Sequence, residues 1–351
     1  MSTVITDATK RDSYTFELKF QTKDQRPLGR ERLSPRDLDR ALFATWFAGL
    51  RHGQFRDFQP VWDRSWVEPL FTEDSAPGRA RGFRVGVETG ADPQVLEFGL
   101  DYFSSRATRR RVAMLRDKTI TDDDEVFFYL DCFYEDAAPP EHGMSLSVSE
   151  ACGSVPIRDG CFHDFSEATA WDQPDSADPT VVIPKSVIDE AVEETRAAPD
   201  REIGGLLLGH IHRDRARQDV FVEVTACVSA AGTTDATATS VTFTPESFRK
   251  ARDLIRLRDR GEIILGWQHS HPMRFCQECP LPTPVECLRK ILFFSMDDVQ
   301  LMETTFPQPF QLGLLTAVEP RLDAALGHAP VRLFGWRHAE IQARGFQVIS
   351  D

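Results

Sequence analysis

Long apolar runs are missing from this sequence of 351 residues. No segment approaches the roughly 20 consecutive apolar residues that a membrane-spanning helix needs. The stretch from Met1 to Asp7 lacks the charged and apolar regions of a signal peptide. These two absences predict a cytoplasmic protein with no membrane partner.

Positive charge is also in short supply. The chain has 41 Lys and Arg residues against 55 Asp and Glu residues, a formal net charge of −14. A chain of this sign gains little from counterion release or from anionic lipid, so we expect no nucleic-acid partner. The basic run from Arg106 to Arg111 is typical of a solvated strand end or loop.

Cysteine is sparse and irregularly spaced. Seven cysteines are an odd number, and their scattered positions do not suggest a disulfide framework. We therefore expect a reducing compartment in which the thiols are free or bound to metal.

The polar, proline-bearing segment Trp171–Pro179 is the predicted domain boundary, because regular strand and helix signals begin just after it. It divides the chain into a domain over 1–170 and a domain over 180–351. The first is predicted to be an α+β module with one long helix after Ser34 and a small antiparallel sheet. Its expected strands cover 14–21, 83–88, 95–103, 110–115 and 125–134.

The second domain shows the alternating strand and helix signals of an α/β architecture, a mixed sheet with helices against it. Helices are expected at Ser186, Thr244 and Ser295, with the two serines as caps. The expected strands cover 181–183, 202–211, 219–228, 262–269, 310–317 and 331–336.

The end of the strand predicted over 262–269 carries a His-x-His pair, His269 and His271. Side chains alternate along an extended segment, so both imidazoles point the same way and can meet one metal ion. Asp298, one turn into the following helix, would complete three ligands and leave a fourth position for water, as in catalytic zinc sites. A His-x-His pair alone also fits hydrogen-bonded histidines in a core.

This set predicts metal-assisted hydrolysis of an amide. Zinc held by His269, His271 and Asp298 would lower the pKa of its bound water to about 7. Glu202 would take the proton of that water and deliver it to the leaving amine. The Ser295 hydroxyl would stabilise the developing oxyanion, although Ser-x-x-Asp is also a common helix cap.

Together these residues resemble the JAMM (JAB/MPN) metallopeptidase family over residues 180 to about 318. The family pattern is a glutamate before a Gly-Leu-x-x-Gly strand, then His-Ser/Thr-His-Pro, then Ser-x-x-Asp. Here the pattern is found in Glu202 with 205–209, in 269–272, and in Ser295 with Asp298. Asp297 neighbours the aspartate of the motif, but the spacing selects Asp298.

The resemblance implies a cytidine-deaminase-like α/β fold and a zinc isopeptidase that cleaves after the C-terminal Gly-Gly of ubiquitin or a ubiquitin-like protein. It implies His269, His271 and Asp298 as zinc ligands, Glu202 as general acid/base and Ser295 as oxyanion donor. Bacterial members are often encoded with ubiquitin-like proteins and their activating and conjugating enzymes, including in antiphage defence systems. A composition rich in Arg, Asp and Ala favours such a bacterial context. The domain over 1–170 resembles no family, and partner or substrate recognition is its expected role.

The segment 273–294 departs from the family pattern, because most members have a much shorter stretch between the proline and the serine. This insert contains Cys276, Cys279 and Cys287. A Cys-x-x-Cys hairpin with a third cysteine fits a second, structural zinc, for which Cys227, Cys152 and Cys161 are candidate fourth ligands. Some relatives that cleave ubiquitin chains use a metal-bearing insert to guide the substrate. The alternative is three unliganded thiols in a proline-rich loop.

Two other functions stay open. One is a non-catalytic MPN-type scaffold or binding module; such relatives typically lack one or more metal ligands, whereas this chain keeps all three. The other is a JAMM peptidase that acts on a sulfur-carrier protein or a small peptide.

Overall fold

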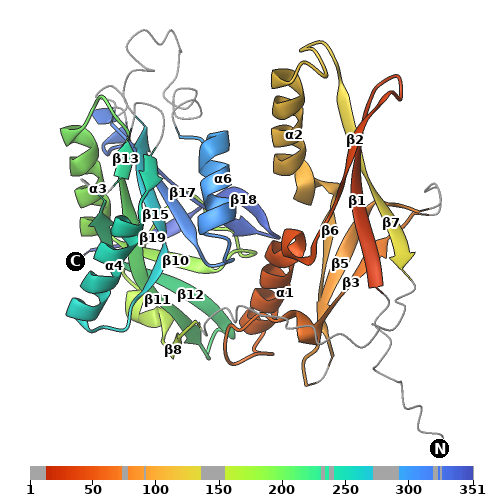
Figure 1. Cartoon of the computed structure of the whole chain (residues 1–351). Helices are drawn as coiled ribbons and strands as arrows, with labels where there is room; N and C mark the ends of the chain where they lie inside the picture. Colours follow the sequence, from red (N-terminus) through yellow and green to blue (C-terminus); the bar gives the residue numbers. More distant parts are fainter. Residues whose placement is uncertain are drawn as a thin grey trace, which may run out of the picture. The chain divides into compact units, whose positions relative to one another are not determined.

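The computed structural model describes residues 13–72, 78–90, 92–135, 155–230, 234–236, 241–271, 292–318, 323–324 and 326–350. The chain forms two compact units (Figure 1). Unit 1 comprises Met1–Gly49 and Gln59–Ser154, and unit 2 comprises Leu50–Phe58 and Val155–Asp351. No helix within the described ranges is long and apolar enough to cross a membrane.

The described part of unit 1 contains two antiparallel sheets and two α-helices, the first of which ends in the segment 50–58 of unit 2. The first sheet has the order β2 (Pro27–Arg32), β1 (Ser13–Thr22), β7 (Val126–Glu135) and β4 (Arg79–Ala80). The second has the order β3 (Ser65–Leu70), β5 (Gly82–Val87) and β6 (Gln94–Gly99). The helices are α1 (Asp39–Arg51), α2 (Ser104–Arg116) and the 3-10 helices η1 (Pro35–Leu38), η2 (Trp62–Arg64) and η3 (Leu100–Phe103).

The strand predicted over 110–115 is wrong, since these residues lie in α2. Ala, Arg, Met and Leu dominate this helix, and all four favour helical backbone. Met114 is buried against the unit, whereas the β-branched Val112 that suggested a strand is 48% exposed. The single small sheet predicted for this part is likewise two sheets, and a second helix joins the one predicted after Ser34.

Unit 2 is built on one mixed sheet. Its order is β18 (Glu340–Arg344), β17 (Val331–Arg337), β16 (Leu312–Ala317), β15 (Ile263–His271), β11 (Gly204–Asp214), β12 (Asp219–Ser229), β10 (Thr180–Pro184), β19 (Phe346–Ile349) and β9 (Thr169–Trp171). β8 (Ile157–Asp159) also pairs with β11, and β13 (Thr234–Ala236) pairs with β14 (Val241–Phe243). The helices among the described residues of this unit are α3 (Lys185–Ala197), α4 (Pro245–Arg258), α6 (Met296–Thr305) and the 3-10 helix η4 (Phe162–Phe165).

The sheet mixes parallel and antiparallel pairs, as predicted for an α/β architecture. β15 runs antiparallel to β11 and parallel to β16, and the crossover from β15 to β16 carries α6. α3 packs against β10, β12 and β16, and α4 packs against β11 and β14. The predicted N-cap Ser186 is wrong by two residues: the helix begins at Lys185, with Pro184 as the N-cap.

The predicted boundary segment is part of unit 2. Its first residue, Trp171, ends β9, which pairs with β19. Its Asp178 is buried and accepts hydrogen bonds from the Arg337 guanidinium at 3.0 and 2.6 Å. Both contacts hold the segment in place within unit 2. The chain passes from one unit to the other after residues 49, 58 and 154, and not at 171–179.

Residues 50–58 also pack within unit 2. The buried Phe58 ring meets Phe310 edge-on, with centroids 5.6 Å apart. The Arg213 guanidinium donates to the carbonyls of Phe55 and Arg56 at 2.8 and 2.7 Å. This early segment therefore belongs to the same core as strands more than a hundred residues later.

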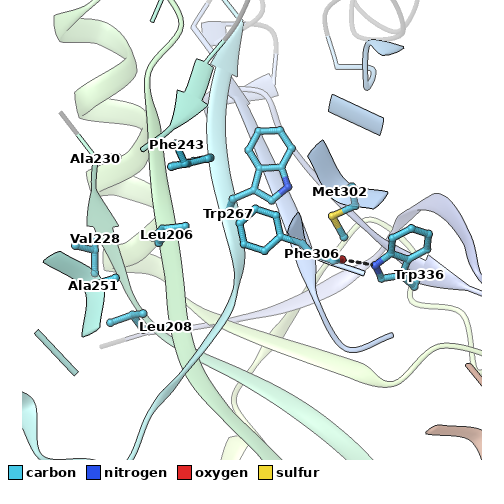
Figure 2. Close-up of a cluster of buried hydrophobic side chains, with 10 residues drawn as sticks. All are labelled: Leu206, Leu208, Val228, Ala230, Phe243, Ala251, Trp267, Met302, Phe306 and Trp336. Atoms are coloured by element: carbon cyan, nitrogen blue, oxygen red, sulfur yellow. Dashed lines mark hydrogen bonds between the residues drawn. The ribbon is translucent and has the colours of Figure 1, made fainter. Parts of the chain in front are cut away.

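A hydrophobic cluster supports the histidine-bearing strand (Figure 2). Trp267 of β15 lies in it with Leu206 of β11, Met302 of α6 and Trp336 of β17. The indole N–H of Trp336 donates to the carbonyl of Phe306 at 2.8 Å, which ties β17 to the end of α6. α6 is thus fixed to the same face of the sheet that carries Trp267.

Gly266 allows β15 to approach β16 closely. It has a φ of +149°, and a Cβ there would lie 1.9 Å from the carbonyl oxygen of Leu312. The β11–β15 ladder shifts register beside it, between Leu207 and Leu208. This bulge sets which face of β15 the following histidines occupy.

Candidate metal centre

The last residues of β15 alternate between the two faces of the sheet. His269 stacks on Trp267 with ring centroids 4.3 Å apart and planes 12° apart, on the face of the hydrophobic cluster. The side chain of Gln268 lies on the other face, where its Nε2 donates to Thr316 Oγ1 at 2.9 Å. Thr316 Oγ1 lies 2.8 Å from Thr195 Oγ1 of α3. His269 and His271 therefore share the face opposite to α3.

α6 brings a carboxylate to this face. Ser295 is its N-cap, as predicted, and Asp298 lies in its first turn. Asp298 Oδ1 is 3.3 Å from His269 Nε2, and its Oδ2 is 3.9 Å from His271 Nε2. One ligand atom from each of these three buried residues lies within 4.8 Å of the other two. The structure thus brings together the three residues that the sequence analysis assigned to a metal.

The donor set fits a zinc ion. Two ligands about 2.0–2.1 Å from zinc at the tetrahedral angle lie about 3.3 Å apart, and the observed separations of 3.3 and 3.9 Å are at and slightly above that value. His269 is fully buried, yet neither ring nitrogen has a well-aligned hydrogen-bond partner among the described residues. A buried imidazole in that situation is costly unless a cation binds it.

The protonation states of Asp298 and His269 also favour binding of a cation. Burial raises the pKa of the Asp298 carboxyl, but contacts with His269 and His271 outweigh burial and hold the pKa well below its usual value. Burial lowers the pKa of His269. An ionised carboxylate beside a neutral imidazole is the protonation state that metal ligation requires.

Glu202 approaches the histidines from the segment before β11. Gly204 pairs with His269, and the same antiparallel register carried two residues further puts Glu202 opposite His271 on the same face. Glu202 is 6% exposed. Burial raises its pKa from 4.5 to about 7; the His271 imidazole opposes this shift, whereas the charges of Asp298 and Asp297 add to it. A carboxyl that titrates near neutral pH can both accept and release a proton.

Ser295 is held beside Asp298 in a capping box. Its Oγ accepts the N–H of Asp298 at 3.2 Å, and its own N–H donates to Asp298 Oδ2 at 2.7 Å. The Ser295 side chain also forms a hydrogen bond that lowers the pKa of the Asp298 carboxyl. The interpretation of Ser-x-x-Asp as a helix cap is therefore correct, and the oxyanion role of the hydroxyl stays a prediction.

Aromatic rings surround the group, and the sequence analysis did not assign them to the site. Phe294 lies 5.6 Å from the His269 ring, and the half-exposed Phe293 lies 5.4 Å from the His271 ring. The sequence signal that could have identified these two rings was their position just before Ser295. These rings exclude water from one side of the imidazoles and strengthen electrostatic interactions there.

The proposed second zinc lies outside the described residues, because Cys276, Cys279 and Cys287 fall within 272–291. Cys152 also falls outside them. Of the other candidate ligands, Cys161 is exposed and Cys227 faces Gly205. Burial raises the pKa of the Cys227 thiol to about 12, which disfavours the thiolate that zinc requires.

Comparison with known proteins identifies a family match for part of the chain. No curated protein matches the chain significantly. One similar solved structure is the solution structure of a protein from Desulfitobacterium hafniense, with 19% identity, a TM-score of 0.30, and coverage of 49% of this chain and 93% of that one. Residues 184–274 match the family described as prokaryotic homologs of the JAB domain. This range contains Glu202, His269 and His271, and the mixed α/β sheet around it is consistent with an MPN-like domain. The match therefore supports the JAB/MPN family for this part of the chain.

Proposed function

We propose that this protein is a zinc-dependent peptidase of the JAMM type, which hydrolyses the amide bond after the C-terminus of ubiquitin or a ubiquitin-like protein. The observation that carries the proposal is the buried group of His269, His271 and Asp298 with the carboxyl of Glu202 beside it, its pKa raised to about 7. The ubiquitin-like substrate comes from the motif resemblance, as does a bacterial conjugation or antiphage defence context.

The chain's own residues have separable tasks in this reaction. His269, His271 and Asp298 would hold the ion, and zinc, when bound, would supply Lewis acidity for the activation of water and the polarisation of a carbonyl. Glu202 takes a proton from the attacking water as the new C–O bond forms. The same carboxyl then passes that proton to the amine nitrogen as the C–N bond breaks. The Ser295 hydroxyl donates to the oxygen of the former carbonyl while it carries negative charge.

A fusion assay tests this function. The substrate is a ubiquitin-like protein that ends in Gly-Gly and continues into a reporter, and the enzyme is the full chain with one equivalent of zinc. We expect cleavage after the Gly-Gly, and we expect Glu202→Gln to keep its zinc but lose about 10²–10⁴-fold in kcat. Glu246→Gln is the matched control: this exposed carboxylate of α4 pairs with Arg249 and lies outside the metal group, so its kcat stays within a few-fold of wild type.

The other outcomes separate the alternatives. Undiminished cleavage by Glu202→Gln rejects the acid/base role of that residue. Binding of the fusion without cleavage by the zinc-loaded wild type indicates an MPN-type binding module. Cleavage of sulfur-carrier fusions or peptides, without cleavage of the ubiquitin-like fusion, indicates that the substrate is a sulfur-carrier protein or a small peptide. Metal analysis that returns one zinc per chain rejects the predicted second, structural zinc.

A further inference from the structure

Ser270, the residue between the two histidines, makes a pair of hydrogen bonds to a second strand. It is buried, with 1% of its surface exposed. Its backbone N–H donates to the carbonyl of Ile203 at 3.0 Å. Its Oγ accepts the N–H of Ile203, also at 3.0 Å. Both backbone groups of the residue next to Glu202 are therefore bound to Ser270.

These two bonds continue the ladder between β11 and β15 beyond its last pair, Gly204 and His269. In a regular antiparallel ladder, every second pair of opposite residues exchanges two backbone hydrogen bonds. Here the Ser270 hydroxyl takes the place of its carbonyl as the acceptor. The pair Ile203–Ser270 thus keeps the register for one more step, and the next step is Glu202 opposite His271.

Glu202 has no strand of its own to hold it. It lies between the end of α3 and the start of β11, in a segment without regular secondary structure. Its neighbour Ile203 is fixed on both backbone groups, so the path of the chain at Glu202 depends on that anchor. An error of about 1 Å in the place of a proton-transfer group can cost about 10²-fold in rate.

We propose that Ser270 is a positioning residue for Glu202, acting through the N–H and carbonyl of Ile203. The hydroxyl contacts neither the ion nor the substrate; it fixes the distance from the Glu202 carboxyl to the histidine strand. This inference rests on the proposed function for its catalytic consequence, but the anchor itself can be measured without any activity.

The first test is amide hydrogen exchange of the full chain in the zinc-loaded state. We expect slow exchange at Ile203 in the wild type and faster exchange there in Ser270→Ala, with exchange in β16 unchanged. Ser270→Thr keeps a hydroxyl and restores the protection. Equal exchange at Ile203 in wild type and Ser270→Ala overturns the proposal, whether or not the protein cleaves anything.

The second test uses kinetics on the fusion substrate. Ser270→Ala is expected to bind one equivalent of zinc as the wild type does, and to lose about 10–100-fold in kcat with KM within about twofold. Ser270→Thr recovers most of this loss. Thr45→Val is the matched control, because it removes another buried hydroxyl, which donates to the carbonyl of Ala41 in α1. A kcat of Ser270→Ala equal to wild type, or an equal loss in Thr45→Val, overturns the positioning role.

A folding failure of Ser270→Ala does not leave the proposal untested. Ser270→Cys keeps the volume but replaces the oxygen with a weak acceptor, and the same exchange and kcat changes are expected of it. If the wild type itself cleaves no fusion, the proposed function fails. The amide hydrogen exchange at Ile203 then tests by itself whether Ser270 anchors this residue.

Discussion

Ser295 and Asp298 bind each other through two reciprocal hydrogen bonds at the start of α6. The Ser295 N–H donates to Asp298 Oδ2 at 2.7 Å, and the Asp298 N–H donates to Ser295 Oγ at 3.2 Å. The same Asp298 carboxylate lies 3.3 Å from His269 Nε2. One side chain therefore caps a helix and belongs to the candidate metal group. The helix cap orients the carboxylate, so the ligand is preorganised before any ion binds.

Replacement of Ser295 should separate stability from catalysis. Ser295→Ala removes the acceptor for the Asp298 N–H, and we expect a loss of about 1 kcal/mol in the free energy of unfolding. The loss of the hydroxyl donor should also lower kcat by about 10²–10³-fold. Urea unfolding and the fusion assay measure the two effects. Thr244→Ala, at the N-cap of α4, serves as the control: it should lose similar stability and keep its kcat.

The pKa of Glu202 predicts a pH dependence of stability in the metal-free protein. The folded state raises this pKa from 4.5 to about 7, so between these values the folded chain binds more protons than the unfolded chain. Stability should therefore fall as pH rises through this window, by about 3 kcal/mol in total. Glu202→Gln carries no such charge and should be more stable than wild type at pH 8, but equal to it below pH 4.5.

The contribution of Asp298 has the opposite sign, which keeps the two effects apart. Its pKa is lowered in the folded state, so its stabilisation is present at neutral pH and is lost as pH falls below the ordinary value of 3.8. Urea unfolding of the wild type and of Glu202→Gln at several pH values provides the test. A constant difference between wild type and Glu202→Gln across pH 4.5–7 would contradict the prediction.

Removal of metal should destabilise the wild type. An ion that binds only the folded state adds about 2.7 kcal/mol when its free concentration is 100 times Kd. A chelator should therefore lower the thermal midpoint of the zinc-loaded protein. Asp298→Asn, which loses a charged ligand, should start from a lower midpoint and respond little to the chelator. An unchanged wild-type midpoint would mean that no stabilising metal was bound.

Two glycines offer a matched pair for the sheet. Gly266→Ala places a Cβ 1.9 Å from the Leu312 carbonyl oxygen at a φ of +149°, and we expect a loss of more than about 4 kcal/mol or no folded protein. Gly327 also has a positive φ, +76°, but a Cβ there meets nothing within 4 Å. Gly327→Ala should cost only about 1 kcal/mol. Similar losses in both variants would show that strain, and not the approach of β16, dominates.

Local signals predicted the elements beside the candidate site well. The helix expected at Ser295 is α6, and the helix expected at Thr244 is α4. Caps and proline act within one turn of the backbone, so the sequence contains their full cause. The proximity of His269 and His271 follows in the same way from strand alternation.

Other features depend on contacts that are distant in the sequence. β8 pairs with β11, β9 pairs with β19, and β19 also pairs with β10, so these short strands depend on partners that lie far away in the sequence. The position of Glu202 follows from the register between two strands, and the anchor at Ser270 from a hydroxyl that replaces a carbonyl. Neither is visible in a motif, which shows residue types and spacing but not pairing.

The two-piece composition of unit 2 has a practical consequence for anyone who works with this chain. A fragment that starts at residue 155 would expose the surface of Phe310 that Phe58 covers and would leave the Arg213 guanidinium without its carbonyl acceptors. Such a truncation should aggregate on expression, even though it retains every residue of the motif. A minimal catalytic module has to carry 50–58 as well, for instance joined through a circularly permuted linker, before it can be moved to another protein.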